Sequence, residues 1–447
     1  MVAVAEPLNV LSDLMGRATR AGANAADAIY FDAASISVAQ RLGASEKLER
    51  AESCDLGLRV FIGKRQAIVS STDFAPETLD ELVERAVAMA RIATEDPYCG
   101  IADPSQLITN IPALDMCDPS EPTAEDLTEL ATRAEDAARA IDGVTNSDGG
   151  EAGWSRANIA VAATNGFAQA YSMSSQSFSA CVIAGEDTGM ERDYDYDSAV
   201  YGADLKSPED IGRSAGERAV KRLNARRVES QQAPIIYDRR VSSGLVRHLT
   251  GAINGASIAR GTSFLKDSMG QAIFGSEIAI IDDPHRMRGL RSKPFDGEGI
   301  ANSRRALVEN GKLTTWVLDL ASSRQLGLET TGHASRGTSS PPSPGSTNVY
   351  MENGSVSLAE LMSDIKSGLY ITEMIGMGVN GVTGDYSRGA TGFWIENGEL
   401  TFPVTELTVA GNLKDMFLHL TPADDLEFKF GIDAPTLRID GMTVAGL

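Results

Sequence analysis

The sequence predicts an α+β protein, with a mixed helix and sheet region over residues 1–227 and a β-rich domain over residues 235–447. In the first region, segments whose apolar residues recur at helical spacing are separated by segments in which apolar and polar residues alternate, as they do in strands. In the second region, short apolar runs are separated by glycines and polar turn residues. A chain of 447 residues, 42% of them hydrophobic, is long enough for two or three domains with cores of their own.

Four amphipathic helices are expected in the first region, and three of them have recognisable starts. Pro76 suits a first helical position, and Thr123 with Asp126 three residues later resembles a capping box. Ser207 before Pro208 provides a third start, and the basic residues at the end of that helix suit the negative end of its dipole. The expected helices lie at residues 8–21, 76–93, 123–143 and from 207 into the basic run 222–227.

Strands with two tight turns are expected between these helices. Asn165-Gly166 is a dipeptide typical of a two-residue hairpin turn, and Gly63-Lys64 suits a second hairpin. Residues 96–122 contain five prolines and are expected to form an irregular connector between two subdomains, 1–100 and 120–227. The expected strands lie at residues 28–38, 57–70, 159–163 and 167–183.

The boundary between the two regions is placed at residues 228–234, because their polar composition is typical of a linker. One helix is expected over residues 242–259, and mainly β structure follows it. Within that structure the sequence predicts a turn at Asn310-Gly311, an exposed loop at 330–348 and a short helix at 358–366.

Composition excludes several classes of protein. The net charge of −22 opposes nucleic-acid binding, which requires a basic face to neutralise phosphates. The four cysteines are scattered and form no C-x-x-C pair, a distribution that fits a reducing compartment. The first residues lack the basic and long apolar stretches of a signal peptide, and no apolar run approaches the ~20 residues of a membrane span. We therefore expect a cytoplasmic protein that binds neither nucleic acid nor a membrane.

The glycine-rich segment 368–417 contains the strongest motif match, which nevertheless fails. Gly376 to Gly381 match G-x-G-x-x-G, the pattern of a dinucleotide site. Such a site needs a helix immediately after the glycines to hold the pyrophosphate, whereas further glycines follow here. The nine glycines of this segment indicate β structure with close backbone approaches.

Two other groups of residues are candidate metal sites. Asp193, Asp195 and Asp197 would share one face of a strand and could hold a hard cation. The spacing of a known calcium loop is missing, so a solvated edge face above buried tyrosines is favoured. The chain has four histidines, and no two of them have the spacing at which a helix presents a pair of zinc ligands.

Several segments together resemble the TldD/PmbA family, formerly called modulators of DNA gyrase, and most closely its PmbA (TldE) branch. The matches at Phe295–Gly299 and Gly368–Phe417 are the most specific. The matching segments are Gly57–Gly63, Met190–Tyr196, Ala259–Asp267, Phe295–Gly299 and Gly368–Phe417.

The resemblance implies a two-part α+β architecture and a heterodimer with a TldD-type partner. In that partner a helix with the sequence H-E-x-x-x-H and a cysteine of the C-terminal domain hold zinc. The pair is expected to cleave unfolded or peptide substrates, including precursors of peptide antibiotics and small antitoxins.

This chain departs from the catalytic branch at its zinc site. Counted back from Gly261, the positions of the two histidines and the glutamate are occupied by Val246, Gly251 and Arg247. No cysteine follows Cys181. We therefore expect no catalytic residue, metal ligand or cofactor in this chain, and zinc only in the partner subunit.

The glycine-rich segment provides the candidate peptide groove or interface, because glycines allow a second backbone to come close and an extended peptide can add to a sheet edge. Its residues are Gly376, Gly378, Gly381, Arg388 and Gly389. The alternative is that these glycines serve tight packing inside the chain. A regulatory protein that acts on another protein and a stand-alone peptidase that uses the aspartate face also remain open, as does a homodimer when the partner is absent.

Overall fold

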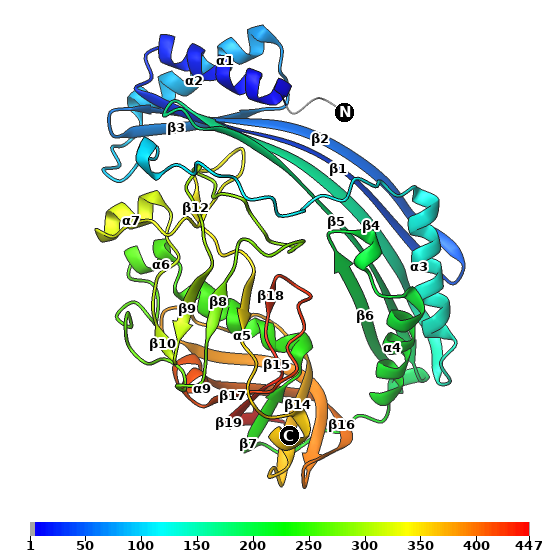
Figure 1. Ribbon diagram of the computed structural model, residues 1–447. Helices are drawn as coiled ribbons and strands as arrows, with labels where there is room; N and C mark the ends of the chain where they lie inside the picture. The colour runs from blue at the N-terminus through cyan, green and yellow to red at the C-terminus, as the bar shows by residue number, and fades with distance from the viewer. Residues whose placement is uncertain (1–4, 447) are drawn as a thin grey trace.

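The computed structural model describes residues 5–446 and shows a long curved sheet whose concave side holds a second, β-rich part of the chain (Figure 1). The α+β prediction is therefore confirmed. Residues 1–4 and 447 lie outside the described residues. They form the outer ends of the two predicted regions, and residues 1–4 also belong to the segment that lacks the features of a signal peptide.

The curved sheet is antiparallel and has the strand order β3-β2-β1-β4-β5-β6. Because β1 pairs with both β2 and β4, the segments before and after the proline-rich connector share one sheet. Both predicted hairpin turns are confirmed, one between β2 and β3 and one between β4 and β5. The strands are β1 (Ala25–Arg41), β2 (Ala44–Ile62), β3 (Arg65–Ser71), β4 (Val144–Ala163), β5 (Ala168–Ala184) and β6 (Glu191–Ala199).

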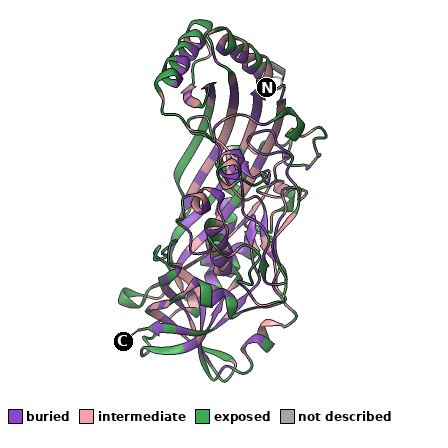
Figure 2. Cartoon of the chain, turned by 90° about the vertical axis from the view of Figure 1, so that its left-hand side faces the viewer, coloured by how far each residue is buried: buried purple, intermediate pink, exposed green. Residues whose placement is uncertain are grey.

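Two pairs of helices cover opposite ends of this sheet, each over its own hydrophobic cluster. The Thr123 side chain accepts a hydrogen bond from the Asp126 amide and Asp126 bonds back, which confirms the predicted capping box. Figure 2 shows exposed residues on the outer faces of the first pair and buried residues beneath them. The helices are α1 (Ala5–Arg20), α2 (Pro76–Ile92), α3 (Ala124–Arg139) and α4 (Pro208–Lys221).

The second part is built on a sheet with the strand order β16-β15-β14-β7-β19-β17, in which β16 also pairs with β19. The predicted linker at 228–234 is correct only for its first residues, because β7 begins at Gln231 and lies between β14 and β19. The strand begins with two exposed glutamines, which resemble a linker in the sequence, but its Ala233 and Ile235 are buried in the main core. The strands are β7 (Gln231–Tyr237), β14 (Ser367–Ile375), β15 (Asp385–Glu396), β16 (Glu399–Asn412), β17 (Leu420–Pro422) and β19 (Leu437–Ala445).

The helix predicted at 242–259 is two helices, α5 (Arg239–Ala252) and α6 (Gly255–Ala259). The break lies at Asn254, whose side chain caps the second helix by accepting a hydrogen bond from the Ala256 amide. Helix α5 buries Leu245 and Leu249 in the main core.

The remaining elements are short. A second sheet has the strand order β10-β9-β8-β13-β18, and 3-10 turns lie at 104–106, 187–189 and 202–204. Among residues 5–446 no helix is long and apolar enough to span a membrane. The short elements are β8 (Ile280–Asp282), β9 (Arg305–Glu309), β10 (Lys312–Leu313), α7 (Leu320–Leu326), β11 (Ala334–Ser335), β12 (Ser343–Pro344), β13 (Val349–Met351), α8 (Leu358–Met362), α9 (Leu413–Leu418) and β18 (Ile432–Asp433).

The segment 330–348, here called the interdomain loop, extends from the second part to the curved sheet (Figure 1). The predicted loop is confirmed, but it is exposed only in part, since His333 and Ala334 are buried and the Arg336 guanidinium donates to Asp27 of β1. The loop packs closely on the curved sheet, since a Cβ at Gly57 of β2 would lie 2.1 Å from the Thr338 carbonyl oxygen.

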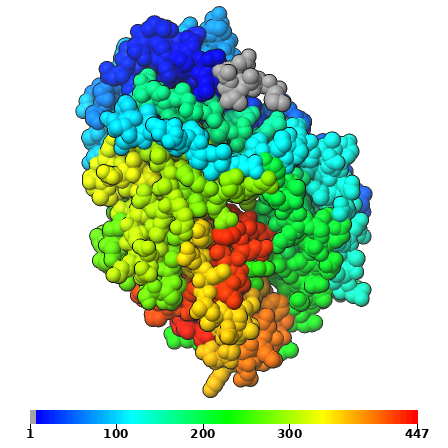
Figure 3. Space-filling model, in the orientation of Figure 1, coloured from blue at the N-terminus to red at the C-terminus, as the bar shows by residue number. Residues whose placement is uncertain are grey.

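The connector at 96–122 runs across the surface between the two parts, as the pale blue band of Figure 3 shows. Its predicted irregular structure is confirmed apart from one 3-10 turn. Arg324 of α7 ties it to the second part by donating to the carbonyl oxygens of Tyr98, Gly100 and Ile101.

The segment Phe295–Gly299 also joins the two parts. The Phe295 ring meets those of Phe167 and Tyr171 of the curved sheet at 5.2 and 5.3 Å between centroids. Burial raises the pKa of Asp296 to about 6 and the pKa of Glu298 to about 8. This segment of the family resemblance therefore lies at the joint between the two parts.

Candidate functional site

Helix α5 contains the three positions at which the catalytic branch is expected to carry its two zinc-binding histidines and its glutamate. The Val246 side chain is 1% exposed and belongs to the main hydrophobic core. Arg247 is an exposed cation, and Gly251, one turn further on, has no side chain. Zinc in proteins is held by cysteine, histidine and carboxylate groups, so these residues do not fit the metal.

A cavity of about 350 Å³ lies beside these positions. It brings Arg247 and Gly251 of α5 together with Gly381 and Arg388 of the glycine-rich segment, although more than a hundred residues separate them in the sequence. The lining residues are Arg247, His248, Gly251, Ala252, Ser257, Thr262, Ser263, Phe264, Met377, Val379, Gly381, Arg388 and Leu413.

The other predicted groove glycines have different surroundings. A Cβ at Gly378 would lie 1.9 Å from the Ser387 carbonyl oxygen, so this glycine permits a close approach within the chain. Gly389 packs against Ile375, whereas a Cβ at Gly376 or Gly381 would meet nothing within 4 Å. Internal packing therefore accounts for Gly378, while Gly381 faces the cavity.

The charge in this cavity is positive and lacks a counter-ion. Among residues 5–446, no carboxylate lies within ion-pair distance of Arg388 or Arg247, and Nε of Arg388 is buried without a hydrogen-bond partner. The His248 ring packs edge-on against Tyr386 at 5.9 Å, and its Nε2 is also buried without a partner. Burial, followed by the charge of Arg388, lowers the pKa of His248 to about 4, so this imidazole is neutral at pH 7.

The aspartates of β6 are buried, and their interpretation as a solvated edge face is wrong. Asp193 accepts from Arg240 at 2.9 Å, and Asp195 pairs with Arg218 at 3.1 Å. Tyr194 and Tyr196, on the opposite face of the strand, stack at 6.3 Å and are only half-buried. The outcome differs because helix α4 and the second part of the chain both supply cations to this edge strand, which a local pattern does not reveal. Within residues 5–446 no group of His, Cys, Asp and Glu is arranged to hold a metal ion.

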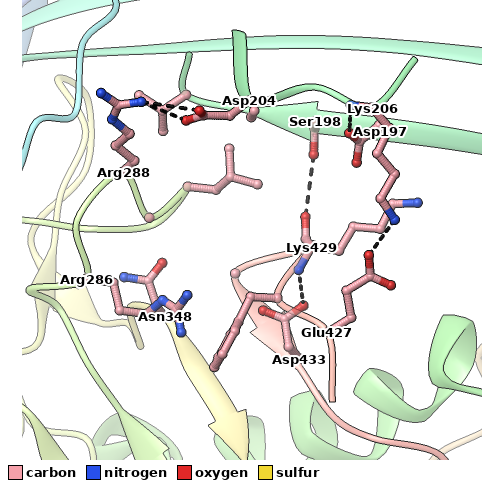
Figure 4. A pocket seen from close by; sticks show the side chains of 16 residues that line it. Asp197, Ser198, Asp204, Lys206, Arg286, Arg288, Asn348, Glu427, Lys429 and Asp433 are labelled. Carbon is pink, nitrogen blue, oxygen red and sulfur yellow. Dashed lines mark hydrogen bonds and ion pairs between the residues drawn. The ribbon is translucent and has the colours of Figure 1, made fainter. Parts of the chain in front are cut away.

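A separate polar cleft of about 230 Å³ lies where β6 faces the segment 427–433 (Figure 4). Most of its charges are paired: Lys206 contacts Glu427 at 2.5 Å, and Arg288 contacts Asp204 at 3.0 Å. This cleft is therefore a contact surface between the two parts, unlike the cavity beside α5.

The sequence pointed to the α5 positions and to Gly381 and Arg388, but not to their proximity. His248 is one of the four histidines that lack the spacing of a zinc-binding pair in the sequence. The apolar wall of the cavity was missed, because Phe264, Met377 and Leu413 come from three separate segments. Only the shared family resemblance of the segments 259–267 and 368–417 could have indicated that they meet.

Three domain models of one family match the chain. They are described as PmbA/TldA metallopeptidase domain 1 at residues 26–90, central domain at 117–223 and C-terminal domain at 230–446. The chain is 38% identical over 413 residues to Metalloprotease PmbA of Escherichia coli O157:H7, covering 92% of this chain and 90% of that protein. It is 34% identical over 432 residues to the Metalloprotease PmbA homolog of Haemophilus influenzae, covering 96% and 94%.

Two solved structures share the fold over the whole chain. A proposed modulator of DNA gyrase from Bacteroides thetaiotaomicron superposes with a TM-score of 0.90 at 26% identity, covering 98% of each chain. TldE of Thermococcus kodakarensis superposes with a TM-score of 0.87 at 20% identity, covering 98% of this chain and 100% of that one.

Proposed function

The chain belongs to the PmbA/TldD metallopeptidase family, and on this basis we propose that it is the non-catalytic subunit of a heterodimeric zinc metalloprotease. Its partner is a TldD-type subunit that carries the zinc and cleaves unfolded or peptide substrates. This chain stabilises the partner and forms part of the peptide-binding groove.

The observation that carries this proposal is the state of helix α5. Val246, Arg247 and Gly251 together remove every side-chain donor that the helix would need to hold zinc and activate a water molecule. Loss of one ligand would be compatible with a rearranged site. A buried valine, a cation and a glycine at all three positions instead favour a subunit whose role is structural.

The end of strand β14 supports a role in peptide binding. Glu373 to Ile375 pair with β15 on one side, whereas β7 pairs only as far as Ile371, and no other strand among residues 5–446 takes its place. The exposed fraction rises along this stretch to 56% at Ile375 and 90% at Met377. An extended peptide can form backbone hydrogen bonds with such an edge without a strict requirement for sequence, as a protease of unfolded substrates needs.

We place the complex in the cytoplasm. The four cysteines are free thiols that lie in the curved sheet and the connector. Proteins of oxidising compartments more often use their cysteines in disulfides.

Co-expression with an H-E-x-x-x-H homologue from the same genome tests the proposal. Zinc content and peptidase activity are measured for this chain, for the homologue and for the purified mixture. We expect a stable complex, zinc only in the homologue, and peptidase activity that this chain increases but does not possess alone. Stoichiometric zinc and peptidase activity in this chain alone, both lost in His248→Ala, would refute the assignment.

A regulatory protein that acts on another protein is the rival function, and the Bacteroides structure described as a proposed gyrase modulator keeps it in view. It requires a stable complex with that other protein and none with the protease subunit. A stand-alone peptidase using the β6 aspartates is disfavoured, because ion pairs already occupy Asp193 and Asp195.

A further inference from the structure

Arg388 is a cation without a counter-ion in a strongly acidic protein. The chain has a net charge of −22, and other half-buried arginines of the chain contact carboxylates: Arg222 contacts Glu373 at 2.6 Å and Arg240 contacts Asp193 at 2.9 Å. Arg388 is half-buried in the cavity wall, yet no carboxylate of the described chain reaches it. Keeping an unpaired guanidinium away from water is unfavourable, and an external anion would relieve this cost.

The positive charge of Arg388 acts on another group that lines the cavity. Its charge is one of the two causes that depress the pKa of the neighbouring His248, after burial. Because that imidazole is neutral at pH 7, the positive charge at the wall comes from the two arginines, Arg388 and Arg247. No acidic side chain lines the cavity.

The rest of the cavity is largely apolar. Phe264, Val379 and Leu413 form its walls, and the highly exposed Met377 also lines it. A methionine side chain adapts to apolar groups of different shape. The cavity has a volume of about 350 Å³, one cationic wall and otherwise largely apolar walls. Its chemistry suits an amino-acid residue that carries a carboxylate next to apolar atoms.

We propose that this cavity binds a carboxylate group of a peptide, either its C-terminal carboxylate or an Asp or Glu side chain, with Arg388 as the principal counter-charge. The inference rests on the proposed function, because it takes the ligand to be a peptide. It adds a chemical preference to a backbone-pairing site that would otherwise accept any extended sequence. A planar guanidinium suits this role, since it donates two parallel hydrogen bonds to a carboxylate.

Binding of labelled peptides to the isolated full chain, measured by fluorescence anisotropy, tests the inference. Three peptides share one apolar sequence: the first has a free C-terminal carboxylate, the second is amidated, and the third is amidated with one internal glutamate. We expect at least one acid-bearing peptide to bind about tenfold or more tightly than the neutral peptide, as charge-assisted hydrogen bonds do. Which of the two binds tightly identifies the source of the carboxylate.

Variants link that preference to the cavity. Arg388→Gln should abolish it, and Arg388→Lys should keep part of it because the charge remains. Arg85→Gln, an equal charge change on the exposed face of α2, should leave it unchanged. A thermal unfolding curve for each variant shows that the chain is folded.

Equal binding of the three peptides, no binding of any, or a preference that survives in Arg388→Gln would each overturn the inference. The isolated chain is used here, whereas the proposed function is tested on the complex with its partner. An active complex with no carboxylate preference in this chain would therefore remove only the inference about the cavity.

Discussion

Replacing Asp27 by asparagine tests how the two parts of the chain are joined. Asp27 of β1 is 5% exposed at its side chain and contacts two arginines that are equally buried. Arg59 of the same sheet donates to it through Nε at 3.1 Å, and Arg336 of the interdomain loop donates at 2.7 Å. Asparagine keeps the shape of the aspartate but removes the negative charge that the Arg336 guanidinium contacts.

The expected loss follows from this burial. Removing one partner of a buried ion pair leaves an uncompensated charge, which typically costs about 3 to 5 kcal/mol. Burial acts to raise the pKa of Asp27, but the charges of Arg336 and Arg59 outweigh it and lower the pKa below its ordinary value. The stabilisation from Asp27 is therefore present above pH 4 and is lost as the pH falls below it. At pH 7 the full loss should be seen.

Urea unfolding at pH 7 measures the loss. Trp154 reports on the curved sheet, and Trp316 and Trp394 report on the second part, so fluorescence also shows whether the two parts still unfold together. We expect a loss of about 3 to 5 kcal/mol in Asp27→Asn or two separate transitions.

The matched control is Asp80→Asn, which breaks an ion pair with Arg17 whose aspartate is 65% exposed. This change should cost about 0 to 1 kcal/mol. A loss below about 1 kcal/mol in Asp27→Asn, similar to the control, would show that the buried pair does not hold the two parts together.

Three further changes test other parts of the structure. Burial raises the pKa of Glu298 to about 8, so the folded chain retains a proton that the unfolded chain releases above its ordinary pKa of 4.5, and stability falls as the pH rises towards 8. In urea unfolding, the free energy of unfolding of Glu298→Gln should therefore rise relative to that of the wild type between pH 6 and pH 9. A difference between the two proteins that stays constant over this pH range would contradict the prediction. The sign is opposite for His248, whose pKa burial lowers to about 4: its contribution is present above pH 6.5 and is lost as the pH falls towards 4. His248→Phe should reduce this acid loss by about 2 kcal/mol after allowance for solvent screening, and a curve parallel to that of the wild type would refute it. Gly57→Ala brings a Cβ within 2.1 Å of the Thr338 carbonyl oxygen, so it should lower the free energy of unfolding by about 1 to 3 kcal/mol and make proteolysis of the interdomain loop faster. In the control Gly153→Ala the new Cβ lies 3.6 Å from its nearest neighbour, so this variant should be as stable as the wild type. Equal stability of the two glycine variants would count against the close contact.

Local features were predictable from the sequence because their causes lie within a few residues. The start of α3 follows from the Thr123 capping box, and the β4–β5 hairpin follows from Asn165-Gly166. The lack of zinc ligands at Val246, Arg247 and Gly251 is likewise a property of three side chains, which no fold can change.

The errors arose where polar residues are buried by distant parts of the chain. Asp193 can be buried because Arg240, which is distant in the sequence, donates a hydrogen bond to its carboxylate. Strand β7 lies in the centre of its sheet although it begins with two exposed glutamines. A polar pattern predicts exposure only when no partner elsewhere compensates for the burial of its polar groups.

The sequence alone determined the family, the α+β class and the absence of zinc-ligating side chains at three positions of helix α5. Only the tertiary structure placed Arg388 beside that helix, in a cavity with apolar walls and no acidic residue. The physical reason is that side-chain chemistry is encoded residue by residue, whereas the balance of charge in a cavity depends on which distant segments fold around it.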